Sequence, residues 1–125
     1  MRLLVVEDEA MVAMLLEDML SDLGCVVAGS AGDLPRGMAF AADEALALDA
    51  AVLDINLGGE KVFPVAEQLA ARGVPFIFAT GYGRDGVAAG FVRTPVLSKP
   101  YDLRALEAAL VSALRNTTQS GSPHP

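Results

Sequence analysis

Polar side chains suited to phosphate chemistry stand at the ends of four separate apolar runs in the sequence. They are Glu7, Asp8, Asp54, Thr80 and Lys99. Carboxylates within a few ångströms of one another repel unless a cation neutralises them, and shallow oxygen sites of this kind suit Mg²⁺. A lysine ammonium and a threonine hydroxyl can both bind a phosphoryl oxygen. Together these groups predict a phosphoryl-transfer site in which a carboxylate is the nucleophile.

The apolar runs of the chain resemble strands, because they are short and rich in Val, Ile, Leu and Phe. The predicted strands cover residues 2–6, 26–30, 50–55, 75–80 and 95–98. The runs that begin at residues 50 and 75 are apolar almost throughout, which is typical of parallel strands buried on both faces. We therefore expect a sheet with its central strands fully covered.

Helical patterns lie between the predicted strands. Apolar spacing and capping residues predict helices over 10–23, 35–47, 62–72 and 102–115, whereas the four glycines of 81–94 permit at most a short helix. Strands that alternate with helices predict a parallel sheet with helices on both faces. Because the carboxyl ends of parallel strands share one edge, the polar residues are expected to meet there. Asp54 ends the central strand and is the natural nucleophile.

Two enzyme classes fit parts of the sequence and conflict with the rest. Residues 81–86 match the G-x-G-x-x-G pattern of dinucleotide-binding turns. That turn normally follows the first strand of a Rossmann fold, whereas here it follows the fourth strand and little chain remains after it. A haloacid-type phosphatase needs an acid/base aspartate two residues after its nucleophile, and this chain has Asn56 there. Neither class is expected.

Length and composition indicate one small globular domain. The chain has 125 residues, 53% of them hydrophobic, so we expect a domain over 1–116 and a disordered polar tail over 117–125. The net charge of −7 argues against binding to nucleic acid, whose phosphates attract cations. The sequence shows no signal peptide and no apolar stretch long enough for a membrane span, so a cytoplasmic location is expected.

Four motifs in this order give the chain a resemblance to a known family. "VVEDEA", "VLDINL", "FIFATG" and "LSKP" resemble the receiver domain of two-component response regulators, over residues 2 to about 115. The resemblance implies a flavodoxin-like, three-layer α/β/α sandwich with a five-stranded parallel sheet of order 2-1-3-4-5.

The resemblance also implies roles for the acidic residues. Asp54 is expected to be the phosphoacceptor, and Asp8 and Asp54 are expected to bind Mg²⁺ directly. Glu7 would assist through water, and the backbone carbonyl of Asn56 would supply a further ligand. Glu7 stands where most receivers have aspartate, but its carboxylate should still reach a metal-bound water.

A signalling function follows from the same resemblance. A histidine kinase or phosphotransferase protein would donate a phosphoryl group from phosphohistidine to Asp54, and Thr80 and Lys99 would hold the phosphoryl oxygens. The protein would be a stand-alone regulator and not an enzyme. Its output would be a downstream signalling protein, a phosphorelay or a phosphate sink, with strand five, the last helix and 81–94 as the contact surface. The alternative is a receiver-fold interaction module that works without phosphorylation. The oligomeric state is left open.

The chain departs from the usual receiver at its switch. Val96 stands where most receivers have an aromatic residue, and Gly58 replaces a common proline. We therefore expect Thr80 to sense the phosphoryl group and Tyr82 to report it. "PFIFATGYG" is similar to the motif of the FAT GUY group of single-domain regulators of alphaproteobacteria, which is associated with the general stress response.

Overall fold

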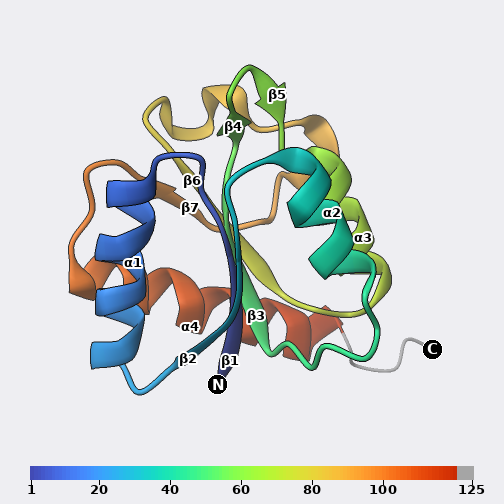
Figure 1. Ribbon diagram of the computed structural model, residues 1–125, viewed down its shortest axis with the longest axis horizontal. Helices are drawn as coiled ribbons and strands as arrows, with labels where there is room; N and C mark the ends of the chain where they lie inside the picture. The colour runs from blue at the N-terminus through green and yellow to red at the C-terminus, as the bar shows by residue number, and fades with distance from the viewer. Residues whose placement is uncertain (121–125) are drawn as a thin grey trace.

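A five-stranded parallel sheet forms the centre of the molecule (Figure 1). The computed structural model describes residues 1–120, with the side chains of 1–84 and 86–115. The sheet has the order β2-β1-β3-β6-β7, which is the predicted 2-1-3-4-5 order because β6 and β7 are its fourth and fifth strands along the chain. The strands are β1 (Arg2–Val6), β2 (Val26–Ala31), β3 (Ala50–Asp54), β6 (Phe76–Thr80) and β7 (Val96–Ser98).

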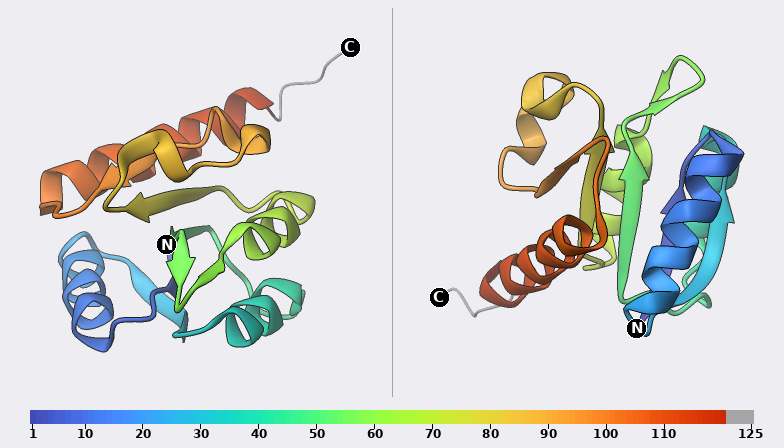
Figure 2. Two further views of the ribbon diagram at one scale, coloured as in Figure 1. Left: turned by 90° about the horizontal axis from the view of Figure 1, so that it is seen from above. Right: turned by 90° about the vertical axis from the view of Figure 1, so that its left-hand side faces the viewer.

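Helices cover both faces of this sheet and complete the predicted three layers (Figure 2). They are α1 (Ala10–Asp22), α2 (Leu34–Ala42), α3 (Phe63–Ala71) and α4 (Leu103–Ser120). One apolar cluster, the α2/α3 core, includes Leu53 and Phe78, and a second, the α1/α4 core, includes Leu16, Ile77 and Leu106. None of the helices in the described part of the chain has the length and apolar character needed to cross a bilayer.

Helix α2 begins as predicted and ends earlier. The Asp33 carboxylate accepts a hydrogen bond from the backbone N–H of Arg36 at 2.9 Å, which caps the first turn. The prediction extended this helix to residue 47, but it ends at Ala42. The Asp43 side chain accepts from the backbone N–H of Ala45 at 3.0 Å, and such local bonds compete with helix continuation.

Helix α4 extends past its predicted end. The Asp102 carboxylate caps it by accepting from the N–H of Ala105 at 2.8 Å. The prediction ended the helix near residue 115, whereas it runs to Ser120, so residues 117–120 of the predicted tail are helical. The first glycine after Asp102 is Gly121, and no earlier residue breaks the helix. Residues 121–125 of the predicted disordered tail lie outside the described residues.

The glycine-rich segment 81–94 contains two short 3₁₀ helices, η1 (Gly83–Gly86) and η2 (Ala89–Phe91), in agreement with the prediction. Arg84 fastens the segment, because its guanidinium donates to the carbonyls of Thr94 at 3.0 Å and Val92 at 2.7 Å. The ring of Phe91 packs against three other phenylalanine rings, those of Phe63, Phe76 and Phe78. The segment is therefore tied down more firmly than its glycine content suggests.

Arg72 links the ends of α2 and α3. Its guanidinium donates to the carbonyl of Ala41 at 2.9 Å and to the carbonyl of Leu46 at 2.7 Å. Arg72→Met keeps much of the apolar stem and removes these donors, so we expect it to lower the free energy of unfolding by about 2 kcal/mol in urea denaturation. Arg36→Met is the control, because the ion pair of Arg36 with Asp33 is exposed, and should cost less than about 0.5 kcal/mol. Equal losses in the two variants would contradict the assigned role.

Candidate functional site

Three carboxylates meet at the carboxyl edge of the sheet, where sequence reasoning placed them. Glu7 and Asp8 follow β1, Asp54 ends β3, and β1 and β3 are neighbours that pair Val6 with Leu53. Each of the three acids offers a carboxylate oxygen, and these oxygens all lie within 4.8 Å of one another. Glu7 and Asp54 are buried and Asp8 is exposed. The donor set matches the predicted oxygen-ligand site.

Lys99 brings a cation to these carboxylates from the far side of β6. Its Nζ lies 3.0 Å from Oε1 of Glu7 and 3.3 Å from Oδ2 of Asp54. The backbone fixes this position, because the N–H of Lys99 donates to the carbonyl of Thr80 at 2.8 Å. Lys99 therefore occupies the place from which its ammonium can meet a group bound to Asp54.

The crowded charges shift the ionisation of the site. Burial, followed by the nearby Glu7 carboxylate, raises the pKa of Asp54 to about 7, although the Lys99 ammonium opposes this shift. Burial alone would lower the pKa of Lys99, but its hydrogen bond to Glu7 and the charge of Asp54 raise it overall. Lys99 therefore stays cationic, whereas Asp54 is only partly ionised near neutral pH until another cation arrives.

Thr80 ends β6 at the same edge of the sheet as Asp54, and Tyr82 and Val96 are the two other residues named for the switch. The Thr80 hydroxyl is buried, and its oxygen accepts a hydrogen bond from the backbone N–H of Tyr82 at 3.0 Å. Tyr82 is 70% exposed, so most of its side chain faces solvent. Val96 is half-buried and packs against the α2/α3 core. The switch roles of Tyr82 and Val96 stay predictions.

A small hairpin projects beyond this edge of the sheet (Figure 1). It pairs β4 (Asn56–Leu57) with β5 (Glu60–Lys61) through a two-residue turn. Gly58 and Gly59 form this turn with φ of +60° and +95°, a conformation that favours glycine over the proline common in receivers. The N–H of Gly58 donates to Oδ2 of Asp8 at 3.0 Å, which ties the hairpin to the site.

Lys61 is a residue of this hairpin that sequence reasoning missed. Its ammonium donates to the side-chain oxygen of Asn56, which lies directly opposite it on the neighbouring strand. The Gly58-Gly59 pair was the available signal, since a two-residue glycine turn places the residues before and after it in register. The pairing of Asn56 with Lys61 could have been predicted from it.

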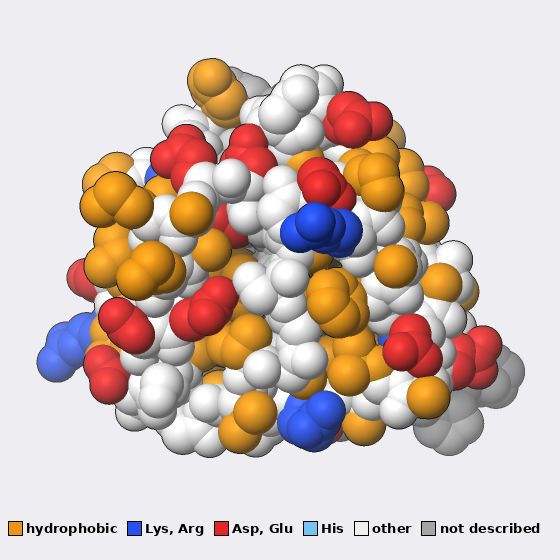
Figure 3. Space-filling view, viewed as in Figure 1, with side chains coloured by type: hydrophobic (Ala, Val, Ile, Leu, Met, Phe, Trp, Pro, Cys, Tyr) orange, Lys and Arg blue, Asp and Glu red, His pale blue; other side chains and the backbone are white. Residues whose placement is uncertain are grey.

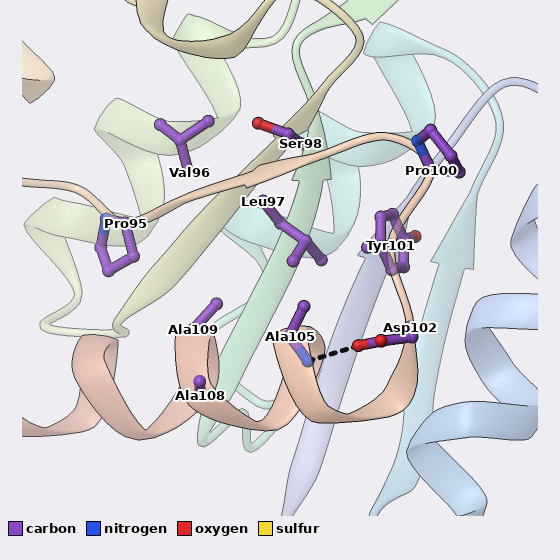
Figure 4. A pocket seen from close by; sticks show the side chains of 10 residues that line it. All are labelled: Pro95, Val96, Leu97, Ser98, Pro100, Tyr101, Asp102, Ala105, Ala108 and Ala109. Carbon is purple, nitrogen blue, oxygen red and sulfur yellow. Dashed lines mark hydrogen bonds between the residues drawn. The ribbon is translucent and has the colours of Figure 1, made fainter.

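A groove runs between the edge strand β7 and helix α4 (Figure 4). The side chain of Leu97 points toward the helix at Ala105, whereas Val96 and Ser98 point the other way. Tyr101 lines the groove close to the site. Burial, followed by the charge of Glu7, raises the pKa of its phenol, which therefore stays neutral. The groove lies on the surface that the resemblance implied for partner contacts.

The sequence and the fold match those of known receivers. Residues 3–111 match the response regulator receiver domain. SdrG from Sphingomonas melonis Fr1 is 45% identical with a TM-score of 0.80, over 90% of this chain and 95% of SdrG. The receiver domain of PhyR from Erythrobacter litoralis is 26% identical with a TM-score of 0.80, over 99% of this chain and 95% of that domain.

A longer protein shares the same domain. PhyR from Brucella abortus is 27% identical with a TM-score of 0.79, and the match covers 95% of this chain but 49% of PhyR. None of the curated proteins compared with the chain matches it. The match over residues 3–111 spans most of the chain and agrees with the observed strand order and with the acidic edge of the sheet. The chain therefore belongs to the response regulator receiver domain family.

Proposed function

We propose that this protein is a phosphoacceptor that takes a phosphoryl group on Asp54 from a phosphohistidine. One observation carries the proposal: the Asp54 carboxylate has an ammonium 3.3 Å away and two further carboxylates with oxygens within 4.8 Å. The cation suits the negative oxygens of an incoming phosphoryl group, and the acids suit a divalent cation that accompanies it.

The chain's own residues account for most of the transfer. A carboxylate oxygen of Asp54 forms a bond to phosphorus while the bond from phosphorus to the donor's imidazole nitrogen breaks. Lys99 can turn from Glu7 and Asp54 toward a phosphoryl oxygen without leaving the site. The Thr80 hydroxyl accepts from Tyr82 and can donate its own proton to another phosphoryl oxygen. Asp54 supplies the nucleophile, and Lys99 and Thr80 position the phosphoryl group and neutralise its charge.

The three acids fit a magnesium ion. Asp8 and Asp54 would hold it directly, Glu7 through a water molecule, and Asn56 through its backbone carbonyl. Bound Mg²⁺ would neutralise the carboxylates and the oxygens of the transferred group. The partly protonated state of Asp54 is the consequence of crowding among acids, and it is the state expected of a cation-binding site considered without its cation.

A protein partner is the expected donor. Hydrophobic side chains gather over α1 (Figure 3). Three residues of this helix are exposed: Met11, Met14 and Leu15. Helix α1 begins directly after the acidic residues, so this apolar patch borders the site. Exposed apolar patches next to a site are typical of protein contacts. We propose that a histidine kinase or phosphotransferase protein docks here and that the protein works in the cytoplasm.

The relatives support a role in stress signalling. SdrG has also been solved in a BeF3-activated conformation, at 45% identity and a TM-score of 0.75 to this chain. PhyR from Bartonella quintana, 21% identical and similar in fold, is described as an anti-anti-sigma factor. Together with the FAT GUY motif around Thr80, these similarities support exchange of phosphoryl groups within a general stress response pathway, with a downstream signalling protein as output.

The direct test is uptake of phosphoryl groups with and without magnesium. We expect label from phosphoramidate, or from a phosphorylated histidine kinase, to appear on the protein in the presence of Mg²⁺. Removal of the metal by EDTA should lower uptake by about a hundredfold or more, because metal clamps on a transferring phosphoryl group are worth several kcal/mol. Calcium chelation by EGTA is the control and should change nothing. A protein that stays folded and takes up no label from any donor would point to the phosphorylation-independent module instead.

A further inference from the structure

The β4–β5 hairpin carries a cation that the phosphoacceptor role leaves unused. Lys61 is exposed at the end of β5, and its ammonium donates to the side-chain oxygen of Asn56. The two residues face each other across the antiparallel pair, so both side chains lie on the same side of the hairpin. We propose that Lys61 is a positioning residue that lengthens the life of the phosphoryl group on Asp54 by holding the Asn56 amide. This inference rests on the function proposed above.

The side chain of Asn56 faces the phosphoryl side of its strand. Its neighbours Ile55 and Leu57 are both buried in the α2/α3 core. Asn56 stands between them and therefore points away from that core. Asp54 is two residues earlier and its carboxylate also lies away from that core, among the acids and Lys99. The Asn56 amide is thus held on the same side as the nucleophile and within the same turn of chain.

The hairpin is anchored to the site at more than one point. The N–H of Gly58 donates to Oδ2 of Asp8 at 3.0 Å, and the N–H of Val62 donates to the carbonyl of Ile55 at 2.9 Å. These bonds fix both ends of the hairpin relative to Asp54. The Lys61 ammonium therefore binds a side-chain amide whose backbone is held in place by these hydrogen bonds.

Loss of the phosphoryl group needs a water molecule, and this arrangement engages one of the groups that could orient that water. Water attacks phosphorus, the bond from phosphorus to Asp54 breaks, and the products are the Asp54 carboxylate, inorganic phosphate and a proton. A neutral oxygen beside the phosphoryl group could orient that water by accepting its hydrogen bond. The Asn56 amide oxygen is such a group, and the Lys61 ammonium occupies it. The amide then presents its N–H donors, which bind phosphoryl oxygens and not the hydrogen of a water.

The test measures how long the label persists after the donor is removed by desalting, with Mg²⁺ held constant. Lys61→Met should shorten the half-life of the label about fivefold. This is the effect expected of one neutral hydrogen bond, from the attacking water to the freed Asn56 amide oxygen. Lys61→Arg should restore it, because arginine can donate to the same oxygen. Arg104→Met, which removes an exposed cation from α4, should leave the half-life as it is.

A double variant separates positioning from simple charge. In an Asn56→Ala background, Lys61→Met should have no further effect, because there is no amide left to hold. An unchanged half-life in Lys61→Met, or an equal change in the Asn56→Ala background, would overturn the proposal. The side-chain amide signals of Asn56 in the unphosphorylated protein give a second readout. They should shift in Lys61→Met and not in Arg104→Met, and unmoved signals would also overturn it. If the wild-type protein takes up no label, the proposed function fails, while the amide signals still decide whether Lys61 holds Asn56.

Discussion

Asparagine in place of Asp54 is expected to abolish phosphoryl uptake, by at least about a thousandfold, because the amide has no oxygen that can act as the nucleophile. The variant keeps the shape of the side chain, so the rest of the site should stay in place. Labelled phosphate from a phosphorylated kinase, followed by peptide mapping, gives the measurement. Asp8→Asn is the matched comparison. It should weaken magnesium binding and slow uptake while still allowing some label on Asp54.

Label that persists in Asp54→Asn at the wild-type level would assign the phosphoacceptor to another residue. Asp8 is the acid to examine in that case, because it is the exposed member of the three and is open to solvent. A change of labelled peptide between the two variants would identify the true acceptor. If neither variant changed the phosphoryl uptake, the acidic cluster would have no role in the transfer.

The Asp54→Asn substitution should also stabilise the protein at high pH in the absence of magnesium. The pKa of Asp54 is raised from 3.8 to about 7 in the folded protein, chiefly by burial. The folded state therefore binds this proton more tightly than the unfolded state does, and the stabilisation is fully present below about pH 4 and is lost as the pH rises through about 7. Asparagine cannot ionise, so Asp54→Asn should raise the free energy of unfolding at about pH 8 by about 2 kcal/mol.

Urea denaturation in EDTA at about pH 5 and about pH 8 checks this expectation. At the lower pH most of Asp54 is protonated, so the gain from asparagine should be smaller than at the higher pH. Added Mg²⁺ should stabilise the wild-type protein more strongly as the pH rises, because the metal competes with the proton on Asp54. An equal gain at both pH values would show that Asp54 is not the group that titrates.

The sequence was sufficient for the sheet and for the charged residues at its edge. The apolar runs that end at Asp54 and Thr80 allow little besides buried parallel strands, and the order of such strands brings their carboxyl ends together. The position of Lys99 follows from the same rule. The contact between Lys99 and Glu7 does not follow from this rule, because the distance between the fifth strand and the first depends on how the sheet twists and packs.

The end of helix α2 could not be predicted from the sequence pattern, because it depends on contacts between residues far apart in the chain. Helix α2 stops at Ala42, where the guanidinium of Arg72 takes up carbonyls that would otherwise continue the helix. That arginine lies thirty-one residues after Ala41, whose carbonyl it binds. The segment around Phe91 similarly owes its position to rings on β6 and α3, and Arg84 binds carbonyls eight to ten residues away. Such long-range bonds override local propensity.

Lys99→Met is expected to have the second large effect, on uptake and on stability together. The change removes the ammonium that meets both Glu7 and Asp54, and the loss of one preorganised donor to a developing charge typically costs about a hundredfold in rate. It also leaves two buried carboxylates without their cation, so the free energy of unfolding in EDTA at about pH 8 should fall by about 3 kcal/mol. Lys99→Arg keeps the charge and should retain more of both properties.

A double variant shows whether the cation acts through Asp54. The Lys99 ammonium lowers the pKa of Asp54, so without it that carboxylate should titrate at a still higher pH and cost more when ionised. Asp54→Asn should therefore recover more stability in the Lys99→Met background than in the wild-type protein, when both are measured in EDTA at about pH 8. Equal gains in the two backgrounds would mean that Lys99 stabilises the fold through Glu7 alone. Phosphoryl uptake by Lys99→Met within threefold of wild type would likewise exclude a direct part in the transfer, because a cation 3.3 Å from the nucleophile cannot be removed from the reacting oxygens at so small a cost.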